Sequence, residues 1–414
     1  MKMKILQVNC VYNRGSTGKI VNDIHKGLQE IEIESIVCYG RGPKTHEPHI
    51  YKTSSEGMAK LNALRSRITG LQYNGSAIAT HRILNIIKRE NPDIVHLHCI
   101  NGYFVNIYKL IEFLKINNIN TVLSLHAEFM HTGSCGHAYE CNKWMVGCGE
   151  CPQLWNATKS YFFDRTSRAW RMMESAFEGF NKLKVVAVSE WLKQRAEKSP
   201  IMKDLDFKVI GNGIDTEKTF YPHDFRNLKA KYGLSDERVL LHVTAGFSLD
   251  EDDIKGGRYI VKLAEKLKRE NIKIIIVGSY NLNLTLPENI INVGRVNNQI
   301  ELARYYSLAD LTVLTSKRET YSMVCAESLS CGTPIVGFKA GAPETISLKS
   351  YSAFVDYGDI NSLDKTIRDW IHVKSHLTST AISSLAKQTY SKEKMNLEYI
   401  KIYTQLYQNI IKES

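Results

Sequence analysis

Two glutamates in the second half of the chain flank the predicted start of a helix. Glu319 and Glu327 lie in the stretch RETYSMVCAESLSCGTPIVG, which follows the buried-strand pattern DLTVLTS. This pattern predicts Glu319 in the loop after the strand and Glu327 on the helix that follows. The start of that helix would supply the backbone N–H groups of Tyr321, Ser322, Met323 and Val324. One carboxylate could then bind sugar hydroxyls, the N–H groups a diphosphate, and the other carboxylate the vicinal hydroxyls of a ribose.

A glycine-containing turn near the N-terminus is a second candidate for binding phosphate. The stretch NRGSTGKI is not a P-loop, because Ile20 stands where Ser or Thr is needed and Asn13 where the first glycine is needed. The pattern predicts a strand, a turn that contains Gly15 and Gly18, and a helix that begins at Gly18. Such a turn places N–H groups at the edge where α/β sheets bind anions. An ordinary tight turn is the alternative.

Four of the nine cysteines fall within seventeen residues, CGHAYECNKWMVGCGEC. Cys148 and Cys151 have the spacing of a zinc knuckle, and Cys135 and Cys141 could complete a tetrahedral site. Our hypothesis is a structural zinc that stiffens an insertion at about residues 130–155. Reduced buried thiols and reversible disulfides are the alternatives. Two nearby histidines, His131 and His137, are further candidate ligands.

Two other patterns are weaker. Asp250-Glu251-Asp252 resembles the Asp-x-Asp motif that holds a nucleotide diphosphate through Mg²⁺ or Mn²⁺, but Lys255 adjoins it, and a solvated acidic loop is the favoured interpretation. His96 and His98 alternate along the strand DIVHLH, and we expect one of them on each side of the sheet.

The elements that must position these residues form two similar series of alternating strand and helix patterns. The first series ends near IGNGIDTEKTFYPHD, after which the pattern restarts with RVLLHVTAG. Alternation of this kind predicts parallel sheets covered by helices. We therefore expect an α/β fold with two Rossmann-like domains, residues 1–212 and 213–390, whose sheets face a central cleft. A helix over 391–414 is expected to cross back to the first domain.

Composition and charge limit the class of protein. With 414 residues, 43% of them hydrophobic and 23% charged, the chain suits a two-domain soluble enzyme. The sequence has no apolar run that could span a bilayer, and its first residues form a strand pattern and not a signal peptide, so we expect a cytoplasmic protein. Residues 1–200 hold 26 Lys and Arg against 17 Asp and Glu, whereas residues 201–414 hold 28 against 26. The basic first half favours an anionic partner, but no nucleic-acid-binding motif supports nucleic acid.

Many stretches along nearly the whole chain resemble the retaining glycosyltransferases of family four, which have the GT-B fold. They include PDIVHLH, VVAVSEWL, VIGNGID, IKGG, NVGRV and YYSLADLTVLTSKRETYSMVCAESLSCGTPIVG. The likeness is to the bacterial type that builds exopolysaccharide, colanic acid or O-antigen. It implies that Glu327 binds the ribose, Glu319 the donor sugar and Lys255 the diphosphate.

The resemblance also implies roles for residues outside that stretch. Gly294, Arg295 and Val296 would line the base pocket, and His126 would lie near the transferred sugar. The loop of Gly15 and Gly18 would face the acceptor and the donor phosphates. One departure is the absence of an Arg a few residues before Lys255, for which Arg258 or Arg318 could substitute.

The expected activity is a metal-independent, retaining transfer of a hexose from a UDP- or GDP-linked donor, with no cofactor needed for catalysis. The acceptor would be a hydroxyl of a glycan or of a polyprenyl-diphosphate-linked oligosaccharide in cell-surface polysaccharide synthesis. No carboxylate could be identified as a covalent nucleophile, so same-face substitution is expected, with Lys255 stabilising the leaving group and Glu319 and His126 orienting the sugar. A nucleotide-sugar epimerase or hydrolase, or a non-catalytic nucleotide- or glycan-binding protein, is the alternative.

The basic N-terminal domain could contact the inner face of the membrane and so reach a lipid-linked acceptor. The aromatic and basic segment over residues 155–180 is the candidate surface for this contact. The alternative is a helix that packs its aromatic face on the first domain.

Overall fold

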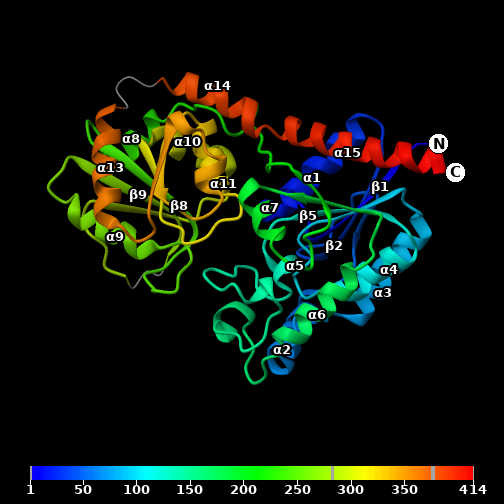
Figure 1. Cartoon of the computed structure of the whole chain (residues 1–414). Helices are drawn as coiled ribbons and strands as arrows, with labels where there is room; N and C mark the ends of the chain where they lie inside the picture. The colour runs from blue at the N-terminus through cyan, green and yellow to red at the C-terminus, as the bar shows by residue number, and fades with distance from the viewer. Residues whose placement is uncertain (1, 281–283, 374–377, 414) are drawn as a thin grey trace. The chain divides into compact units, whose positions relative to one another are not determined.

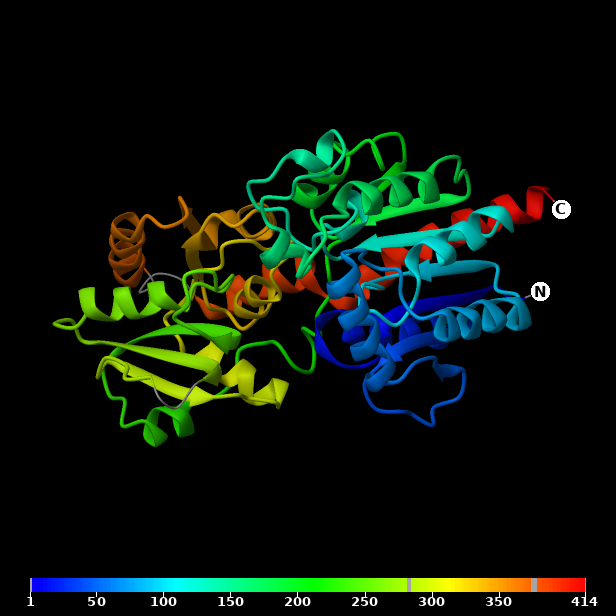
Figure 2. The same cartoon turned by 90° about the horizontal axis from the view of Figure 1, so that it is seen from below.

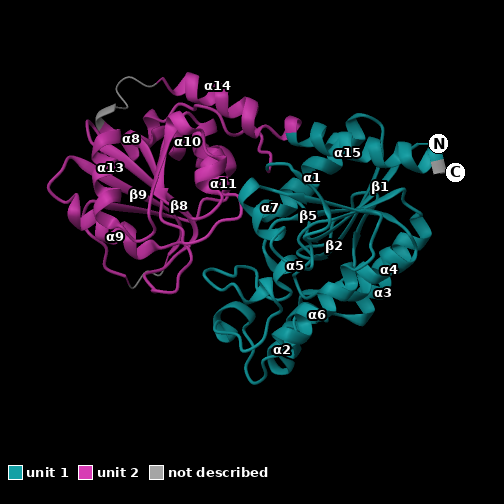
Figure 3. Ribbon diagram, in the orientation of Figure 1, with its two compact units in different colours: residues 1–211, 395–414 teal, residues 212–394 magenta. Residues whose placement is uncertain are grey.

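The structure is a computed structural model that describes residues 2–280, 284–373 and 378–413. The chain divides into two compact units (Figure 3): unit 1 comprises residues 1–211 and 395–414, and unit 2 comprises residues 212–394. Each unit has one parallel sheet covered by helices on both faces (Figure 1), as the alternating pattern predicts. In the part of the chain that is described, no helix has the length and apolar character needed to cross a membrane.

Unit 1 has a seven-stranded sheet in the order β3-β2-β1-β4-β5-β6-β7. Its strands are β1 (Lys4–Val11), β2 (Glu34–Arg41), β3 (Ile50–Lys52), β4 (Ile94–Leu97), β5 (Asn120–Leu125), β6 (Leu183–Ala187) and β7 (Asp206–Val209). The central strands are buried on both faces, which explains their nearly continuous apolar sequences. The strand order reverses between β1 and β4, and the carboxyl ends of these two strands are where α/β sheets bind ligands.

The helices of unit 1 lie on the two faces of this sheet. They are α1 (Gly15–Glu30), α2 (Glu56–Thr69), α3 (Ala77–Glu90), α4 (Ile107–Ile116), α5 (Phe129–Thr132), α6 (Thr166–Phe177), α7 (Glu190–Ala196) and α15 (Lys392–Glu413), with the short turns η1 (Lys143–Met145) and η2 (Leu154–Thr158). From Met395 onward, α15 belongs to unit 1 and packs with α1 against the sheet (Figure 2). Gly27 on α1 permits this packing, because a Cβ there would lie 2.4 Å from Asn396 Nδ2.

Unit 2 has a six-stranded sheet in the order β10-β9-β8-β11-β12-β13. Its strands are β8 (Arg238–Phe247), β9 (Ile272–Tyr280), β10 (Ile290–Gly294), β11 (Leu311–Leu314), β12 (Ile335–Phe338) and β13 (Ser352–Val355). Its helices are α8 (Arg226–Lys231), α9 (Gly257–Lys266), α10 (Gln299–Leu308), α11 (Met323–Ser330), α12 (Pro343–Ile346), α13 (Ile360–Val373) and α14 (Ser379–Tyr390), with the turn η3 (Lys349–Tyr351). The apolar residues of α9 and α13 form one core with the sheet. The strand order reverses between β8 and β11.

A buried ion pair fixes the loop that follows β5 in unit 1. The carboxylate of Glu128 is fully buried, and it accepts hydrogen bonds from Arg195 Nε at 2.5 Å and from the Ala138 N–H at 2.9 Å. Desolvation opposes ionisation, but His131, Arg195 and the Ala138 N–H together lower the pKa of Glu128 to about 2. Arg195 also lies over the rings of Trp144 and Trp191.

Replacing Arg195 by Met is expected to lower the free energy of unfolding of the protein by about 3–5 kcal/mol, because Glu128 is then buried without its cation. Equilibrium unfolding in urea measures this loss. Lys193 lies on the same helix and pairs with the exposed Glu190 and Glu197, so Lys193→Met is the matched control and should change stability by less than about 0.5 kcal/mol. Equal effects of the two substitutions would contradict this account of the buried pair.

Candidate functional site

The strand reversal in unit 2 brings two loops together at the carboxyl ends of β8 and β11. The loop after β8 is held to the loop after β11 because the Lys317 N–H donates to the Ile254 carbonyl at 2.8 Å and Thr315 Oγ1 donates to the Lys255 carbonyl at 2.9 Å. Gly256 has a φ of +68°, and a Cβ there would lie 2.3 Å from the Thr315 carbonyl oxygen, so the turn requires glycine. These constraints place Lys255 directly before α9.

Lys255 and Glu319, both predicted from the sequence, form an ion pair at this position. Lys255 Nζ lies 2.6 Å from Glu319 Oε1, and the two side chains are 35% and 16% exposed. The backbone of Glu319 is fixed by the loop after β12, since its N–H donates to the Ala340 carbonyl at 2.9 Å and its carbonyl accepts from the Ala342 N–H at 3.1 Å. The pair offers a cation for a phosphate and a carboxylate for hydroxyl groups in one partly exposed place.

Glu327 lies on α11, as predicted, and has a defined partner. Tyr306 OH donates to Glu327 Oε2 at 2.9 Å. Burial and the neighbouring Glu327 raise the pKa of Tyr306 well above its usual value, so the phenol stays a donor. The phenol is thus one hydrogen-bond partner of the Glu327 carboxylate, whose two oxygens can accept about four hydrogen bonds in total. The sequence did not point to Tyr306, because one tyrosine on an amphipathic helix carries no distinctive spacing.

The N-terminal turn of α11 lies between the two glutamates. The helix begins at Met323, and Ser322 before it has a φ of +85°. The first N–H groups of a helix have no partner within it, so Met323 and Val324 are placed as predicted for anion binding. Tyr321 is buried, and its hydroxyl donates to the Asn212 carbonyl at 2.9 Å, so its side chain supports the loop.

Arg295 and Val296 follow the edge strand β10, after Gly294 with its φ of +78°. They therefore share the carboxyl edge of the sheet with Lys255 and Glu319. Their role in a base pocket stays a prediction.

Arg258, one of the two candidates for replacing the missing Arg near Lys255, has partners of its own. Arg258 Nη1 lies 3.0 Å from Glu251 Oε1, its Nη2 donates to Tyr259 OH at 3.3 Å, and its guanidinium lies 5.0 Å from the Tyr259 ring. Glu251 is 92% exposed, as expected for a solvated acidic loop. Within residues 2–280, 284–373 and 378–413, no three His, Cys, Asp or Glu side chains are arranged to hold a metal ion.

In unit 1, Gln7 on β1 and two histidines that come directly after β4 and β5 form a hydrogen-bonded chain. Gln7 on β1 lies with its Oε1 3.1 Å from His98 Nε2, and His98 Nδ1 lies 3.4 Å from His126 Nε2. Burial lowers the pKa of His126 to about 4 and that of His98 well below its usual value, so both rings are neutral. If Gln7 Oε1 accepts from His98, then His98 Nδ1 accepts from His126, and the tautomer of His126 is fixed.

The prediction that His96 and His98 face opposite sides of the sheet was wrong. Their ring centroids are 3.7 Å apart, because residues two positions apart along a strand point to the same side. His96 is buried and bonds to Tyr403 OH at 2.6 Å and to Ser124 Oγ at 2.8 Å, so it ties α15 to the sheet.

The turn of Gly15 and Gly18 lies at the carboxyl end of β1, as predicted, but its helix starts earlier. Helix α1 begins at Gly15, which has a φ of +60°, and Gly18 lies in its first turn. A Cβ at Gly18 would lie 3.0 Å from Val11 Cγ2, so glycine lets the first turn approach the strand. The earlier start places the N–H groups of residues 15–18 at the helix terminus.

Comparisons with known proteins agree with this geometry. The model of Glycosyltransferase Family 4 matches residues 18–218, and the model of Glycosyl transferases group 1 matches residues 225–387. WcaC of Escherichia coli (strain K12), a glycosyl transferase named for colanic acid biosynthesis, is 23% identical over 98% of this chain and 100% of its own.

Solved structures show the same fold. The sucrose-phosphate synthase of Thermosynechococcus elongatus has a TM-score of 0.68 at 14% identity, over 99% of this chain and 100% of that one. HepE of Anabaena, solved with UDP and glucose, has a TM-score of 0.66 at 16% identity, over 97% and 99%. The chain therefore belongs to the glycosyltransferases that the two family models describe, and it is a transferase of the GT-B fold.

Proposed function

We propose that this enzyme moves a hexose from a UDP- or GDP-linked donor to a glycan hydroxyl with retention of anomeric configuration and without a catalytic metal. The ion pair of Lys255 and Glu319 at the strand reversal of unit 2 is the observation that supports this most directly. The cation suits the diphosphate of a nucleotide sugar, and the carboxylate beside it suits hydroxyl groups of the sugar. The solved complexes of HepE with UDP-glucose, a protein of the same fold, agree with such a donor.

The donor diphosphate would replace Glu319 as the partner of Lys255. The helix starts of α9 and α11 would add N–H groups and positive dipole ends to the same phosphates. Glu319, released from Lys255, would accept hydrogen bonds from hydroxyls of the donor sugar, and Glu327 would accept those of the ribose.

The reaction proposed is a same-face substitution. The bond between the anomeric carbon and the β-phosphate oxygen breaks, the bond to the acceptor oxygen forms, and the acceptor proton goes to the departing phosphate. Lys255 and the helix N–H groups stabilise the charge that develops on the leaving group, which is the largest contribution expected at such a site. Within unit 1, His126 and the turn of Gly15 and Gly18 would recognise the sugar and the acceptor.

Donor turnover in the presence of EDTA tests this function. The enzyme is incubated with UDP- and GDP-hexoses and simple methyl glycosides, and proton NMR follows the first sugar products. We expect one donor to be consumed and the new anomeric signal to keep the configuration of that donor. An inverted anomer, a strict requirement for Mn²⁺, or a new nucleotide sugar in place of transfer would contradict the proposal, the last in favour of an epimerase.

An exposed apolar surface on unit 1 supports a lipid-linked acceptor at a membrane. The membrane-facing patch, as we define it, comprises Leu61, Leu64, Ile68, Trp155, Tyr161, Phe162 and Phe163, all exposed. The Tyr161 N–H donates to the Arg67 carbonyl at 2.8 Å, which joins the loop of 155–163 to α2. Lys60, Arg65 and Lys159 are exposed and are close in the sequence to residues of the patch. Surfaces that combine basic and aromatic side chains bind anionic membranes.

Part of the segment 155–180 is a helix that packs its aromatic face on the first domain, which is the alternative to a membrane surface. Helix α6 packs its aromatic face inward, with Trp170 and Phe177 buried. Only the residues before α6 present their rings to solvent.

Replacing Phe162 by Ser is expected to weaken binding to vesicles of phosphatidylglycerol and phosphatidylethanolamine by about 10-fold or more, because a ring that is 70% exposed loses its contact with the acyl region. Co-sedimentation measures this. Ile116 is 72% exposed on α4, outside the patch, and Ile116→Ser is the matched control that should bind as the unmodified protein does. Equal binding of all three proteins would rule out this surface.

A further inference from the structure

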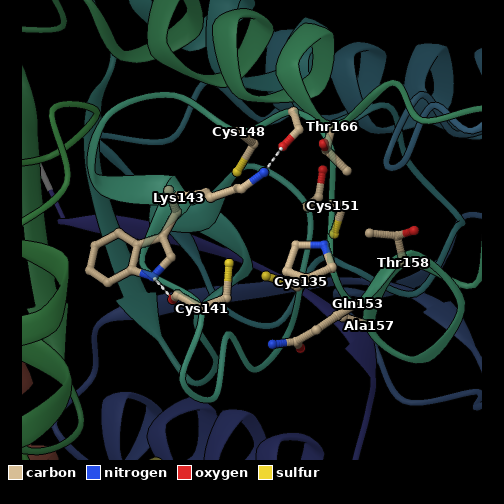
Figure 4. Close-up of a pocket in the computed structure, with 13 residues that line it drawn as sticks. Cys135, Cys141, Lys143, Cys148, Cys151, Gln153, Ala157, Thr158 and Thr166 are labelled. Atoms are coloured by element: carbon tan, nitrogen blue, oxygen red, sulfur yellow. Dashed lines mark hydrogen bonds between the residues drawn. The ribbon is translucent and has the colours of Figure 1, made fainter.

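The four cysteines singled out from the sequence line one pocket in unit 1. Figure 4 shows the side chains of Cys135, Cys141, Cys148 and Cys151 around this space, which Trp144, Pro152 and Thr166 also line. None of the four is in a disulfide. Residues far apart along a loop thus converge on one place that has no role in the proposed donor site.

The segment that carries these cysteines has little regular structure to stabilise it. Between α5 and α6 it contains only the short turns η1 and η2 among the described residues. Its hydrogen bonds include those from Trp144 Nε1 to the Cys141 carbonyl at 2.7 Å and from the Cys151 N–H to Asp164 Oδ2 at 2.5 Å. A loop of this kind gains most from a crosslink or a bound metal.

We propose that Cys135, Cys141, Cys148 and Cys151 bind one structural zinc ion. Four thiolates, two of them in a C-x₂-C turn, are the ligand set that zinc prefers in structural sites. Neither His131 nor His137 lines the pocket; both lie near Glu128, at 3.7 Å and 3.9 Å. The cysteines are therefore the ligands, and the two histidines are not.

The cysteine side chains must move closer together to bind the ion. In the described parts of the chain they are not arranged as a metal site, and a tetrahedral zinc with Zn–S bonds of about 2.3 Å needs sulfur atoms roughly 3.8 Å apart. The C-x₂-C turn has space to move, because a Cβ at Gly147 would meet nothing within 4 Å and one at Gly149 only Ser167 Cβ at 3.5 Å.

A cation compensates the charge of such a site. Zinc with four thiolates carries two negative charges, and Lys143 lines the same pocket. Lys143 Nζ donates to the carbonyls of Gly149 and Glu150 at 3.1 Å and 2.7 Å, so its ammonium is fixed on the C-x₂-C turn itself. The zinc would stabilise the loop that carries Trp155 and its neighbours, and this inference does not depend on the proposed function.

Metal analysis of protein purified without added zinc tests the proposal. We expect about one zinc per chain, and less than a tenth of an equivalent in the Cys148→Ser/Cys151→Ser variant. Cys10 is a free, half-buried cysteine outside the pocket, so Cys10→Ser is the matched control and should keep its zinc. Less than a tenth of an equivalent in the unmodified protein would overturn the proposal, as would zinc retained by the double variant.

A second measurement needs no variant. Titration of the native protein with a mercurial reagent, with a zinc-sensitive dye present, should release one zinc as four thiols react. In a separate experiment, removal of zinc from the native protein by a chelator should increase the rate of proteolysis within residues 133–165 by about tenfold or more. Nine reactive thiols with no zinc released, or cysteines lost in pairs as disulfides, would overturn the proposal.

Discussion

Glu319→Gln is expected to lower kcat for sugar transfer by about 100- to 1,000-fold without weakening the binding of the nucleoside diphosphate. Glutamine keeps the shape of the side chain but loses the charge that, in the proposed mechanism, holds the sugar hydroxyls and faces the developing positive charge. In the structure Lys255 Nζ donates a hydrogen bond to Glu319 Oε1 at 2.6 Å. A ligand phosphate that binds Lys255 must therefore displace Glu319. Removing this competition should leave the Kd for UDP or GDP unchanged or lower it.

The matched control for this substitution is Asp356→Asn. Asp356 belongs to an exposed ion pair of unit 2, with its carboxylate 2.7 Å from Lys339 Nζ, and it lies outside the loops that form the site. This variant should keep the kcat of the unmodified enzyme. A Glu319→Gln enzyme with normal kcat, or one that has lost nucleotide binding, would contradict the role given to Glu319.

Lys255→Met is expected to reduce the affinity for a nucleoside diphosphate by about 10- to 100-fold and to change the affinity for the monophosphate little. A charge-assisted hydrogen bond of about 1.5–3 kcal/mol is lost, and only the second phosphate is expected to reach this position. The ratio of the Kd values for UMP and UDP, or for GMP and GDP, is therefore the quantity to measure by calorimetry. It should fall toward one.

Lys262→Met serves as the matched control for Lys255. Lys262 lies on α9, the helix that follows Lys255, is exposed and has its Nζ 5.6 Å from the Tyr259 ring. Its replacement removes the same charge from a neighbouring position. The ratio should not change in this variant. Equal losses for monophosphate and diphosphate in Lys255→Met would show that the lysine acts on the fold and not on the second phosphate.

The sequence predicts the central strands of both sheets well, because their residues are buried on both faces and read as apolar runs. The sequence carries no clear strand pattern for β3, β7 and β13. All three are edge strands of three or four residues, and β7 and β13 contain no fully buried residue. Short, half-buried strands carry little periodicity, and only pairing with a neighbour defines them.

The ion pair of the candidate site illustrates what the sequence leaves open. Lys255 and Glu319 are far apart in the chain, and they meet because β11 pairs with β8 and not with β10. Nothing in the strand patterns fixes that order. Glu319 was found from its pattern, Lys255 through the resemblance, and their contact through the fold. The positions of Tyr306 beside Glu327 and of Gln7 beside His98 depend on the same packing.

Calorimetry with UDP and GDP in the presence of EDTA, on the protein and on Glu327→Ala, tests the donor site most directly. Glu265→Ala, an exposed carboxylate on α9, is the control that removes the same charge from unit 2. We predict that one of the two nucleotides binds without metal and that Glu327→Ala weakens it by about 10-fold or more, whereas Glu265→Ala does not. If neither nucleotide binds without metal, or if Glu327→Ala binds as tightly as the unmodified protein, then the donor site is not where this account places it.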